Sequence, residues 1–451
     1  MFGELTLTVE ATSTATKRIR LDAEEMSIDK VTDGNGGKLS FDYDGSKLAI
    51  HLPKALQPGK NTTLSVKYRL KDPLAGIYFI QPSEDYPDHP LQVWTQGQDE
   101  DSRHWYPCLD APLQKCTSEI RAIVPEGFVA ISNGELKSHK KLSKARESWH
   151  YELGIPHSPY LIALAVGRFE VLEEKAGDVR VLYVGEKGTS EGLKLAFGNT
   201  PKMINYFSEW LDVPYPYASY TQVAVADFIF GGMENTTATF QTDRVVPDKR
   251  ASLDFDADYL VSHELAHQWF GDLVTCRHWD QAWLNEGFAT FLEIIWLKYH
   301  KGEDEALYSV IQNRDAYLEE DRKRYQRAIV TRRYRNPIDL FDRHLYEKGS
   351  LVLWMLMHRL GETTFRKVVK AYLEKHRYGV VETKDLERAI LEVTGKNMES
   401  FFDTWVRSPG HPALSLSLSQ SVDGKTLHVR VRQKQKGDAI RLSLPLWIET
   451  G

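Results

Sequence analysis

The sequence predicts a multidomain protein. An all-β N-terminal part (1–169) precedes an α+β part (170–409), and the start of a further β domain (410–451) follows. Three observations support this division. The first part consists of short alternating segments between turn residues, the second has a few strands and many helical segments, and strands return after 408–410. A small sheet followed by many helices is an α+β pattern.

Apolar residues alternate with polar ones in the N-terminal part, as at Leu5, Leu7 and Val9. This alternation is typical of strands with one buried face, and clusters of Gly, Asn and Asp between the segments indicate turns. Two stretches, 94–98 (WTQGQ) and 103–110 (RHWYPCLD), interrupt the pattern. On local evidence they are either packed loops or part of a functional site, and both interpretations stay open.

The α+β part begins with a short strand and a helical stretch over 191–211. An extended run, DFIFGGMEN, follows and contains a glycine pair. The apolar periodicity then predicts a helix around HELAH. Further helices are expected over 286–299, 305–327 and 346–360, with shorter ones after Glu362, Lys384 and Asn397.

The segments ALSLSLS, TLHVRVRQ and IRLSLPLWI (440–448) predict strands beyond Gly410, and Asp423-Gly424 indicates a hairpin turn. Three such strands need a partner face against which to bury their apolar side chains. Either they dock on the helical part, or they are the front of a longer protein. We favour the second interpretation, in which the last domain is truncated.

The composition is that of an ordinary globular protein, with 42% hydrophobic residues, 27% charged residues and a net charge of −6. We identify no dense Lys/Arg tract, and we interpret the basic segment 137–146 as a solvated hairpin tip. We therefore expect no nucleic-acid partner and no anionic membrane partner. The chain has no run of eighteen apolar residues, so we also expect no membrane-spanning segment.

Three cysteines, Cys108, Cys116 and Cys276, are too few for a disulfide framework and indicate a reducing compartment. One Cys108–Cys116 bridge stays open. We therefore expect a cytoplasmic protein. The chain begins in mid-strand, which suggests a trimmed N-terminus, so an exported form stays open as well. The oligomeric state is unknown from the sequence.

The most informative motif is His263-Glu264-x-x-His267, followed by Glu286 after eighteen intervening residues. Residues i and i+4 of a helix lie on the same face, so both imidazoles can bind one ion. Glu264 lies beside that face, close enough to hold a metal-bound water. Two histidines, one carboxylate and an open fourth position make the ligand set of a catalytic zinc site. The sequence therefore predicts one Zn²⁺ ion.

The alternative is a buried helix whose histidines are hydrogen-bonded in the core. Leu260, Val261 and Leu265 do supply an apolar flank. These apolar residues lie beside the face that carries the histidines and Glu264, however, and do not occupy that face. Glu286 follows at a distance that allows a loop and a second helix to bring a third ligand to the same ion. We therefore favour the metal site.

A zinc hydrolase also needs a base and a donor for the developing oxyanion. Glu264 is placed to be the base, and Tyr346, at the start of a predicted helix, is the candidate donor. The glycine pair in 231–235 (GGMEN) would let a peptide pair with an extended edge, and Glu234 would bind its free ammonium group. A glycine-rich turn with a solvated glutamate is the alternative.

HELAH with Glu286, GGMEN upstream and YEKG downstream resemble the aminopeptidase N family of zinc metallopeptidases. TQGQ and YPCLDAP are similar to the N-terminal domain of that family. The resemblance extends over nearly the whole chain. It implies a saddle-like β domain over 1–169, a thermolysin-like zinc catalytic domain over 170–409 and the start of a β-sandwich over 410–451.

The resemblance also implies residue roles. Zinc would be bound by His263, His267 and Glu286, with Glu264 as general base and Tyr346 as the stabiliser of the oxyanion. The substrate would be bound by Glu234, Gln96 or Gln98, and by Gly231, Gly232, Met233 and Asn235. The expected function is the release of N-terminal residues from peptides with a free N-terminus by a metal-activated water.

Some residues depart from the family pattern. Gln98 stands where many members carry a carboxylate, which leaves Glu234 as the principal charged clamp. GGMEN and TQGQ are similar to the leukotriene-epoxide hydrolase branch, but Phe341 replaces a tyrosine of that branch, so an epoxide hydrolase-like side activity is only an alternative. A non-catalytic interaction scaffold and a strict endopeptidase are further alternatives. The complete ligand set argues against the former and the amine anchor against the latter.

Overall fold

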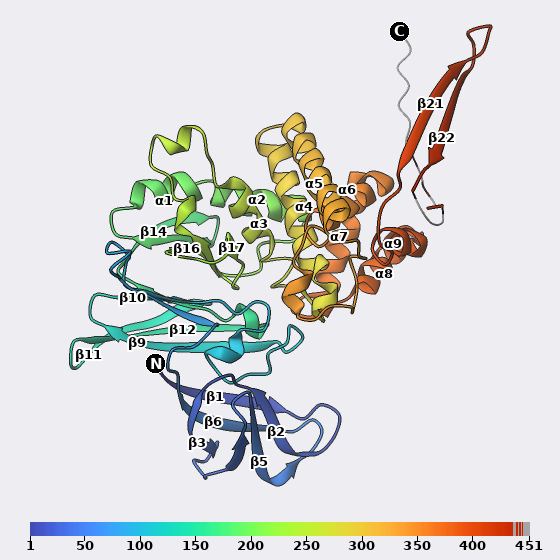
Figure 1. Ribbon diagram of the computed structural model, residues 1–451. Coiled ribbons are helices and arrows are strands. Elements are labelled where there is room, and N and C mark those ends of the chain that lie inside the picture. Colours follow the sequence, from blue (N-terminus) through green and yellow to red (C-terminus); the bar gives the residue numbers. More distant parts are fainter. Residues whose placement is uncertain (436–438, 441, 443, 445–451) are drawn as a thin grey trace.

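The computed structural model describes residues 1–435, 439, 440, 442 and 444. The β-rich N-terminal part forms two layers, and a mixed sheet with a group of helices lies above them in Figure 1. A β-hairpin projects from the helices at the C-terminal end. Among the described residues, no helix is both long and apolar enough to cross a membrane.

The first layer is built from two three-stranded antiparallel sheets that share one apolar core. The first sheet has the order β1 (Phe2–Glu10), β6 (Asn61–Arg69), β3 (Ser27–Asp33), and the second has the order β2 (Thr16–Asp22), β5 (Lys47–Leu56), β4 (Ser40–Tyr43). Burial alternates along β1, as predicted from its apolar pattern. Leu21, Leu48 and Leu64 are fully buried between the sheets.

The second layer connects the first to the helical part. Its two sheets have the orders β11 (Glu135–Leu142), β12 (Arg146–His157), β9 (Cys116–Pro125) and β10 (Val129–Ser132), β13 (Leu164–Gly167), β8 (Gln92–Thr95), β7 (Ile77–Ile80). Strands β11 and β12 pair as a hairpin, so the basic segment 137–146 forms a hairpin as predicted. Strand β8 ends just before Gln96, which brings the TQGQ segment to the base of the helical part. The three cysteines are free thiols.

A five-stranded mixed sheet begins the α+β part. Its order is β14 (Phe169–Ala176), β15 (Val179–Glu186), β16 (Ser219–Val225), β18 (Ala238–Thr242), β17 (Gly232–Met233). Strand β16 is parallel to both neighbours and buried along its whole length, whereas β17 is an antiparallel edge strand. The GGMEN segment therefore lies at the edge of this sheet.

The helix predicted over 191–211 is two helices, α1 (Ser190–Phe197) and α2 (Thr200–Leu211). The break falls at Gly198 and Asn199, just before Pro201. Proline has no N–H to donate and is favoured in the first turn of a helix, so the second helix begins at this point.

The remaining helices form the body of the α+β part. They are α3 (Asp258–Ala266), α4 (Trp283–His300), α5 (Glu303–Lys323), α6 (Glu347–Leu360), α7 (Glu362–His376), α8 (Thr383–Thr394) and α9 (Glu399–Trp405); β19 (Thr275–Cys276) and β20 (Val380–Val381) pair in parallel. Helix α4 begins before its predicted start and α5 ends before its predicted end. Helix α4 packs against α3, α5 and α6, and its Trp283 and Trp296 are fully buried.

The C-terminal hairpin pairs β21 (Leu414–Gln420) with β22 (Leu427–Gln433) and extends away from the helices (Figure 1). Its apolar residues stay exposed, with Leu416 at 59% and Leu418 at 60%. The described part of the hairpin therefore does not dock on the helical part, which was one of the two expectations. The predicted strand 440–448 lies outside the described residues, apart from 440, 442 and 444.

Candidate metal centre

The metal centre predicted from the sequence lies where α3 meets the first turn of α4. Asp258 anchors the start of α3, because its carboxylate accepts a hydrogen bond from the Trp296 indole at 3.0 Å. His263 lies in the last turn of α3, and His267 is its C-cap residue with φ −58° and ψ −25°, still in the helical region. The two imidazoles therefore lie one turn apart on one face. Helix α4 brings Glu286 to the same face.

Three donor atoms converge at this point. The Nε2 atoms of His263 and His267 are 3.1 Å apart, and the Glu286 Oε2 atom lies 3.3 Å from the first and 3.1 Å from the second. Zinc–nitrogen bonds of about 2.0–2.1 Å in a tetrahedral site place neighbouring donors about 3.3 Å apart. The spacing of the three atoms matches that geometry.

Hydrogen bonds at the Nδ1 atoms of the two histidines determine which ring nitrogen carries the proton and which can bind a metal. The Nδ1 atom of His267 donates to the Phe270 carbonyl oxygen at 2.8 Å, and the His263 Nδ1 atom is 2.6 Å from the Glu293 Oε1 atom. With the proton on Nδ1, each neutral ring turns an Nε2 lone pair toward the other and toward the Glu286 carboxylate. Such an arrangement is repulsive without a cation, so these residues fit a divalent metal.

Glu293 is part of this centre and was missed by the sequence analysis. It lies seven residues after Glu286, which is about two helical turns, so both residues fall on the same face of α4. Carboxylates commonly orient metal-binding histidines in this way. The helical spacing of Glu286 and Glu293 could therefore have identified Glu293 from the sequence.

Glu264 points to the same centre and is 4% exposed. Its Oε2 atom has no hydrogen-bond partner among the described residues. Burial raises the pKa of this carboxyl to about 8, although the two neighbouring imidazoles lower it. A Cβ atom on Gly232 would lie 2.3 Å from the Glu264 Oε1 atom, so the glycine leaves room for this carboxylate. From the sequence, the glycine pair was expected to make space for a bound peptide instead.

A group of buried polar atoms without partners surrounds Glu264. We call Gln96, Glu234, Asn235 and Glu264 the unpartnered cluster, because a side-chain oxygen of each lacks a hydrogen bond among the described residues. The ligand atoms of Glu234, Glu264 and His267 lie within 4.8 Å of one another. Buried polar groups are nearly always hydrogen-bonded, so a cluster of exceptions indicates a site for a polar ligand.

The two glutamines of the TQGQ segment have different contacts. Gln96 donates from its Nε2 atom to the Met233 Sδ atom at 3.1 Å, which leaves its Oε1 atom free beside the edge strand. Gln98 donates from Nε2 to the Glu286 Oε1 atom at 3.4 Å. Neither side chain is hydrogen-bonded to Glu234 in the structure. Glu234 is held through its backbone, whose carbonyl accepts from the Gln268 amide at 3.0 Å.

Tyr346 immediately precedes α6, and its ring lies over the ring of His263 with a centroid distance of 6.0 Å. Burial and the carboxylates of Glu286 and Glu234 raise the pKa of this phenol well above its ordinary value. The hydroxyl therefore keeps its proton and is available as a donor.

Asp342 fixes the turn that presents Tyr346. Its Oδ1 atom accepts from the backbone N–H groups of His344 at 2.9 Å and Leu345 at 3.1 Å. The Arg327 guanidinium donates to both oxygens of the same carboxylate, at 2.6 and 2.7 Å. The sequence analysis missed both residues. The capping of a turn by an Asp can be predicted from neighbouring residues in the sequence, whereas the contact with Arg327 depends on tertiary packing.

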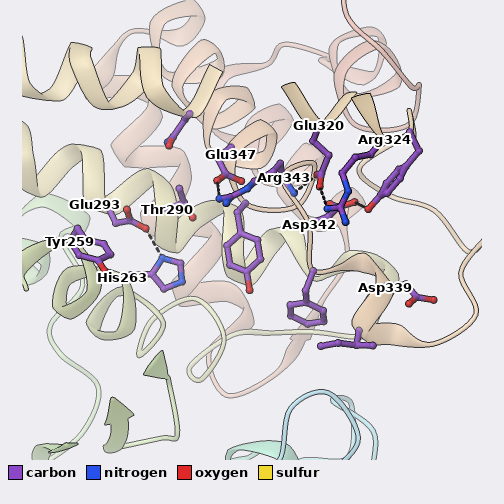
Figure 2. A pocket seen from close by; sticks show the side chains of 15 residues that line it. Tyr259, His263, Thr290, Glu293, Glu320, Arg324, Asp339, Asp342, Arg343 and Glu347 are labelled. Atoms are coloured by element: carbon purple, nitrogen blue, oxygen red, sulfur yellow. Dashed lines mark hydrogen bonds and ion pairs between the residues drawn. The ribbon is translucent and has the colours of Figure 1, made fainter. Parts of the chain in front are cut away.

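A cavity of about 680 Å³, which we call the first cavity, opens beside the centre. Figure 2 shows His263 and Glu293 at one end of it and Glu320, Arg324 and Asp342 at the other. His263 and Tyr346 line this cavity, whereas Gln96, Gln98 and Glu234 do not. The unpartnered cluster and the first cavity thus flank the metal centre on different sides.

Comparison with known proteins adds independent information. A model described as the peptidase family M1 domain matches residues 195–405, and one described as the peptidase M1 N-terminal domain matches residues 1–161. Aminopeptidase M1-A from Oryza sativa subsp. japonica is 31% identical over 84% of this chain and 43% of its own length. The Tricorn protease-interacting factor F2 from Thermoplasma acidophilum is 29% identical over 89% of this chain and 50% of its own length.

The chain spans about half the length of the curated relatives it matches, with 48–50% of the first five covered. Among solved structures, a mutant M1 zinc metallopeptidase from Deinococcus radiodurans, bound to a Tyr-Ser-Ala substrate, superimposes with a TM-score of 0.76. The alignment covers 91% of both chains at 24% identity and shows that the folds are the same.

Proposed function

The chain belongs to peptidase family M1, and on that premise we propose that it is a zinc-dependent aminopeptidase that releases single residues from the N-terminus of peptides. One observation carries the proposal. The donors of His263, His267 and Glu286 lie 3.1–3.3 Å apart beside a buried carboxylate, Glu234, that has a free oxygen.

Zinc is the metal that the donor set favours, because two imidazoles, one carboxylate and a free fourth position are typical of catalytic zinc. When bound, zinc lowers the pKa of a water from 15.7 to about 7 and polarises a carbonyl group. The remaining chemistry belongs to residues of the chain.

Glu264 is the general base of the proposed reaction. Its free Oε2 atom accepts a proton from the attacking water, and the carboxyl then passes that proton to the leaving amine. Tyr346 donates a hydrogen bond to the carbonyl oxygen as negative charge develops on it.

Glu234 sets the cleavage register. Its carboxylate pairs with the free α-ammonium group of the substrate, and the unpartnered Gln96 Oε1 atom accepts a further ammonium hydrogen. The edge strand around Gly232 and Met233 offers a peptide backbone a place to pair as an added strand. Because the ammonium group is anchored next to the metal, only the first peptide bond reaches the water.

No observation favours the alternatives considered from the sequence. The proposal accounts for the proximity of the three donor residues, Glu264 and Tyr346, which a non-catalytic scaffold does not need. Phe341, whose ring lies 6.4 Å from that of Tyr346, brings no hydroxyl for epoxide chemistry.

A panel of fluorogenic aminoacyl substrates tests the proposal when assayed with and without a chelator. We expect release of the fluorophore that a chelator abolishes and added zinc restores. Hydrolysis that survives complete removal of the metal, or no hydrolysis of any aminoacyl substrate by the zinc-loaded protein, would contradict it.

A further inference from the structure

A strongly basic segment begins in the last turn of α5 and continues beyond it. It was not identified from the sequence, for which no dense Lys/Arg tract was expected. Seven of the fourteen residues in 322–335 (RKRYQRAIVTRRYR) are Lys or Arg. The chain as a whole has a net charge of −6, so this concentration is a local feature. The net charge and the composition of the whole chain do not reveal this basic segment, because acidic residues elsewhere outweigh it.

Part of this segment lines a cavity of about 840 Å³, which we call the second cavity. Its charged lining consists of one acidic residue, Asp339, and four arginines, Arg327, Arg333, Arg335 and Arg407. The Asp339 carboxylate is engaged, because it accepts the backbone N–H of Asn336 at 3.0 Å. The wall of the cavity therefore carries an excess of positive charge.

Two of the four arginines are neutralised within the protein. Arg327 pairs with Asp342 at 2.6 Å, and Arg407 pairs with Glu387 and with Asp403. The guanidinium groups of Arg333 and Arg335 are exposed and have no ion-pair partner among the residues that the structure describes. These two charges are available to a ligand.

The second cavity adjoins the first cavity, which borders the metal centre. Tyr325 and Asp339 line both cavities, and the first cavity reaches His263 and Tyr346. Figure 2 shows Asp339 at the end of the first cavity away from His263. A peptide anchored at Glu234 would cross the metal centre, enter the first cavity with the residues beyond the cleaved bond, and continue toward Arg333 and Arg335.

We propose that Arg333 and Arg335 form a subsite for a carboxylate carried by the downstream part of the substrate, so that acidic peptides are preferred. This inference rests on the proposed aminopeptidase function. The carboxylate is either an Asp or Glu side chain or the C-terminus of the peptide, because both present the same planar acceptor to a guanidinium group. Pairs of this kind are exposed, so their effect is moderate and is screened by salt.

The test measures kcat/KM for matched octapeptides with the same N-terminal residue. One set carries Glu or Gln at each position from the third to the eighth, and the other compares a free C-terminal carboxylate with its amide. We expect an acidic-to-neutral ratio of roughly fivefold at low salt for two surface pairs, falling toward one at high salt. The set that shows the ratio identifies the source of the carboxylate.

The double variant Arg333→Gln/Arg335→Gln should bring this ratio to about one, because glutamine keeps hydrogen-bonding capacity but loses the charge. The matched control is Arg121→Gln, which removes an exposed arginine from β9 and should keep the wild-type ratio. Using a ratio cancels any general change in turnover.

A ratio of one in the wild-type protein, or a ratio that the double variant retains, would overturn the inference. Competition by RNA or inorganic phosphate without any acidic-peptide preference would also overturn it, because the arginines would then serve another anion. Failure of the proposed function looks different, since no peptide of either set would be cleaved.

Discussion

The two sides of the metal centre differ in how their charges are satisfied. On one side the unpartnered cluster holds buried carboxylate and amide oxygens with no hydrogen bond among the described residues. On the other, the first cavity is lined by charges that already have partners, such as Arg324 with Glu320 at 3.0 Å and His263 with Glu293 at 2.6 Å. Buried polar groups without partners are costly, whereas paired charges at a surface cost little.

The difference indicates a division of labour. In the proposed reaction, the unpartnered cluster binds one defined polar group and therefore fixes where the substrate begins. In the same proposal, the first cavity accepts varied peptide sequences because its charges are already paired, and selection by charge occurs only farther along, at Arg333 and Arg335. If cleavage register and proton transfer depend on the unpartnered cluster, substitutions there should reduce activity more than substitutions along the first cavity.

The largest effect is expected from Glu264→Gln. The amide keeps the shape of the side chain but cannot take a proton, so kcat should fall by roughly 10³- to 10⁴-fold. Metal content, measured by elemental analysis, should stay at one ion per chain, since Glu264 is not a proposed ligand. A variant with a near-normal rate would remove Glu264 from the mechanism.

Tyr346→Phe comes next. Loss of one donor to a developing oxyanion typically costs about 10²- to 10³-fold in kcat, with little change in KM. Steady-state kinetics on a peptide of fixed sequence measure both constants. If only KM rises, the hydroxyl acts in ground-state binding and the assignment is wrong.

Glu293→Gln tests the carboxylate behind His263. Losing such a partner typically weakens metal binding by about 10- to 100-fold, which competition with a chelator measures directly. Glu305→Gln, an exposed position in α5, is the matched control and should leave the affinity unchanged. Equal affinities in the two variants would show that Glu293 does not orient the ligand.

Gly232→Ala should have a smaller effect, a loss of kcat of about tenfold, because a new Cβ atom displaces the Glu264 carboxylate. Gly231→Ala is a matched control next to it. There the nearest atom to the added Cβ is a Leu260 methyl group at 3.3 Å, which has room to adjust. Comparable losses in both variants would indicate general damage to the edge strand.

Sequence reasoning identified the three side chains whose donor atoms the structure brings together, because their spacing in the sequence is local. His263 and His267 lie one helical turn apart, and Glu286 follows within a single loop. The order of the β-rich and helical parts could also be predicted from the sequence, because the alternation of apolar and polar residues in strands and the periodicity of helices are short-range patterns. Pro201 and the dense positive charge of 322–335 are local sequence signals as well, and they could have predicted the helix break and the basic segment.

Other features depend on contacts between distant segments. No local pattern around Asp342 predicts its ion pair with Arg327. The close approach of Gly232 to Glu264 likewise depends on the packing of the edge strand beside α3. The contact of the Gln96 amide with the Met233 sulfur joins residues 137 positions apart in the chain. Such contacts follow from the tertiary packing of particular side chains, which periodicity does not encode.

The central claim is that Glu234 fixes the register by holding the free amine. The most direct measurement compares kcat/KM for one peptide with a free N-terminus and for its N-acetylated form, in the wild-type protein and in Glu234→Gln. We predict a strong preference for the free amine that collapses toward one in the variant, because the neutral amide no longer pairs with an ammonium group. A preference that survives in Glu234→Gln, or an equal loss on both peptides, would contradict the account.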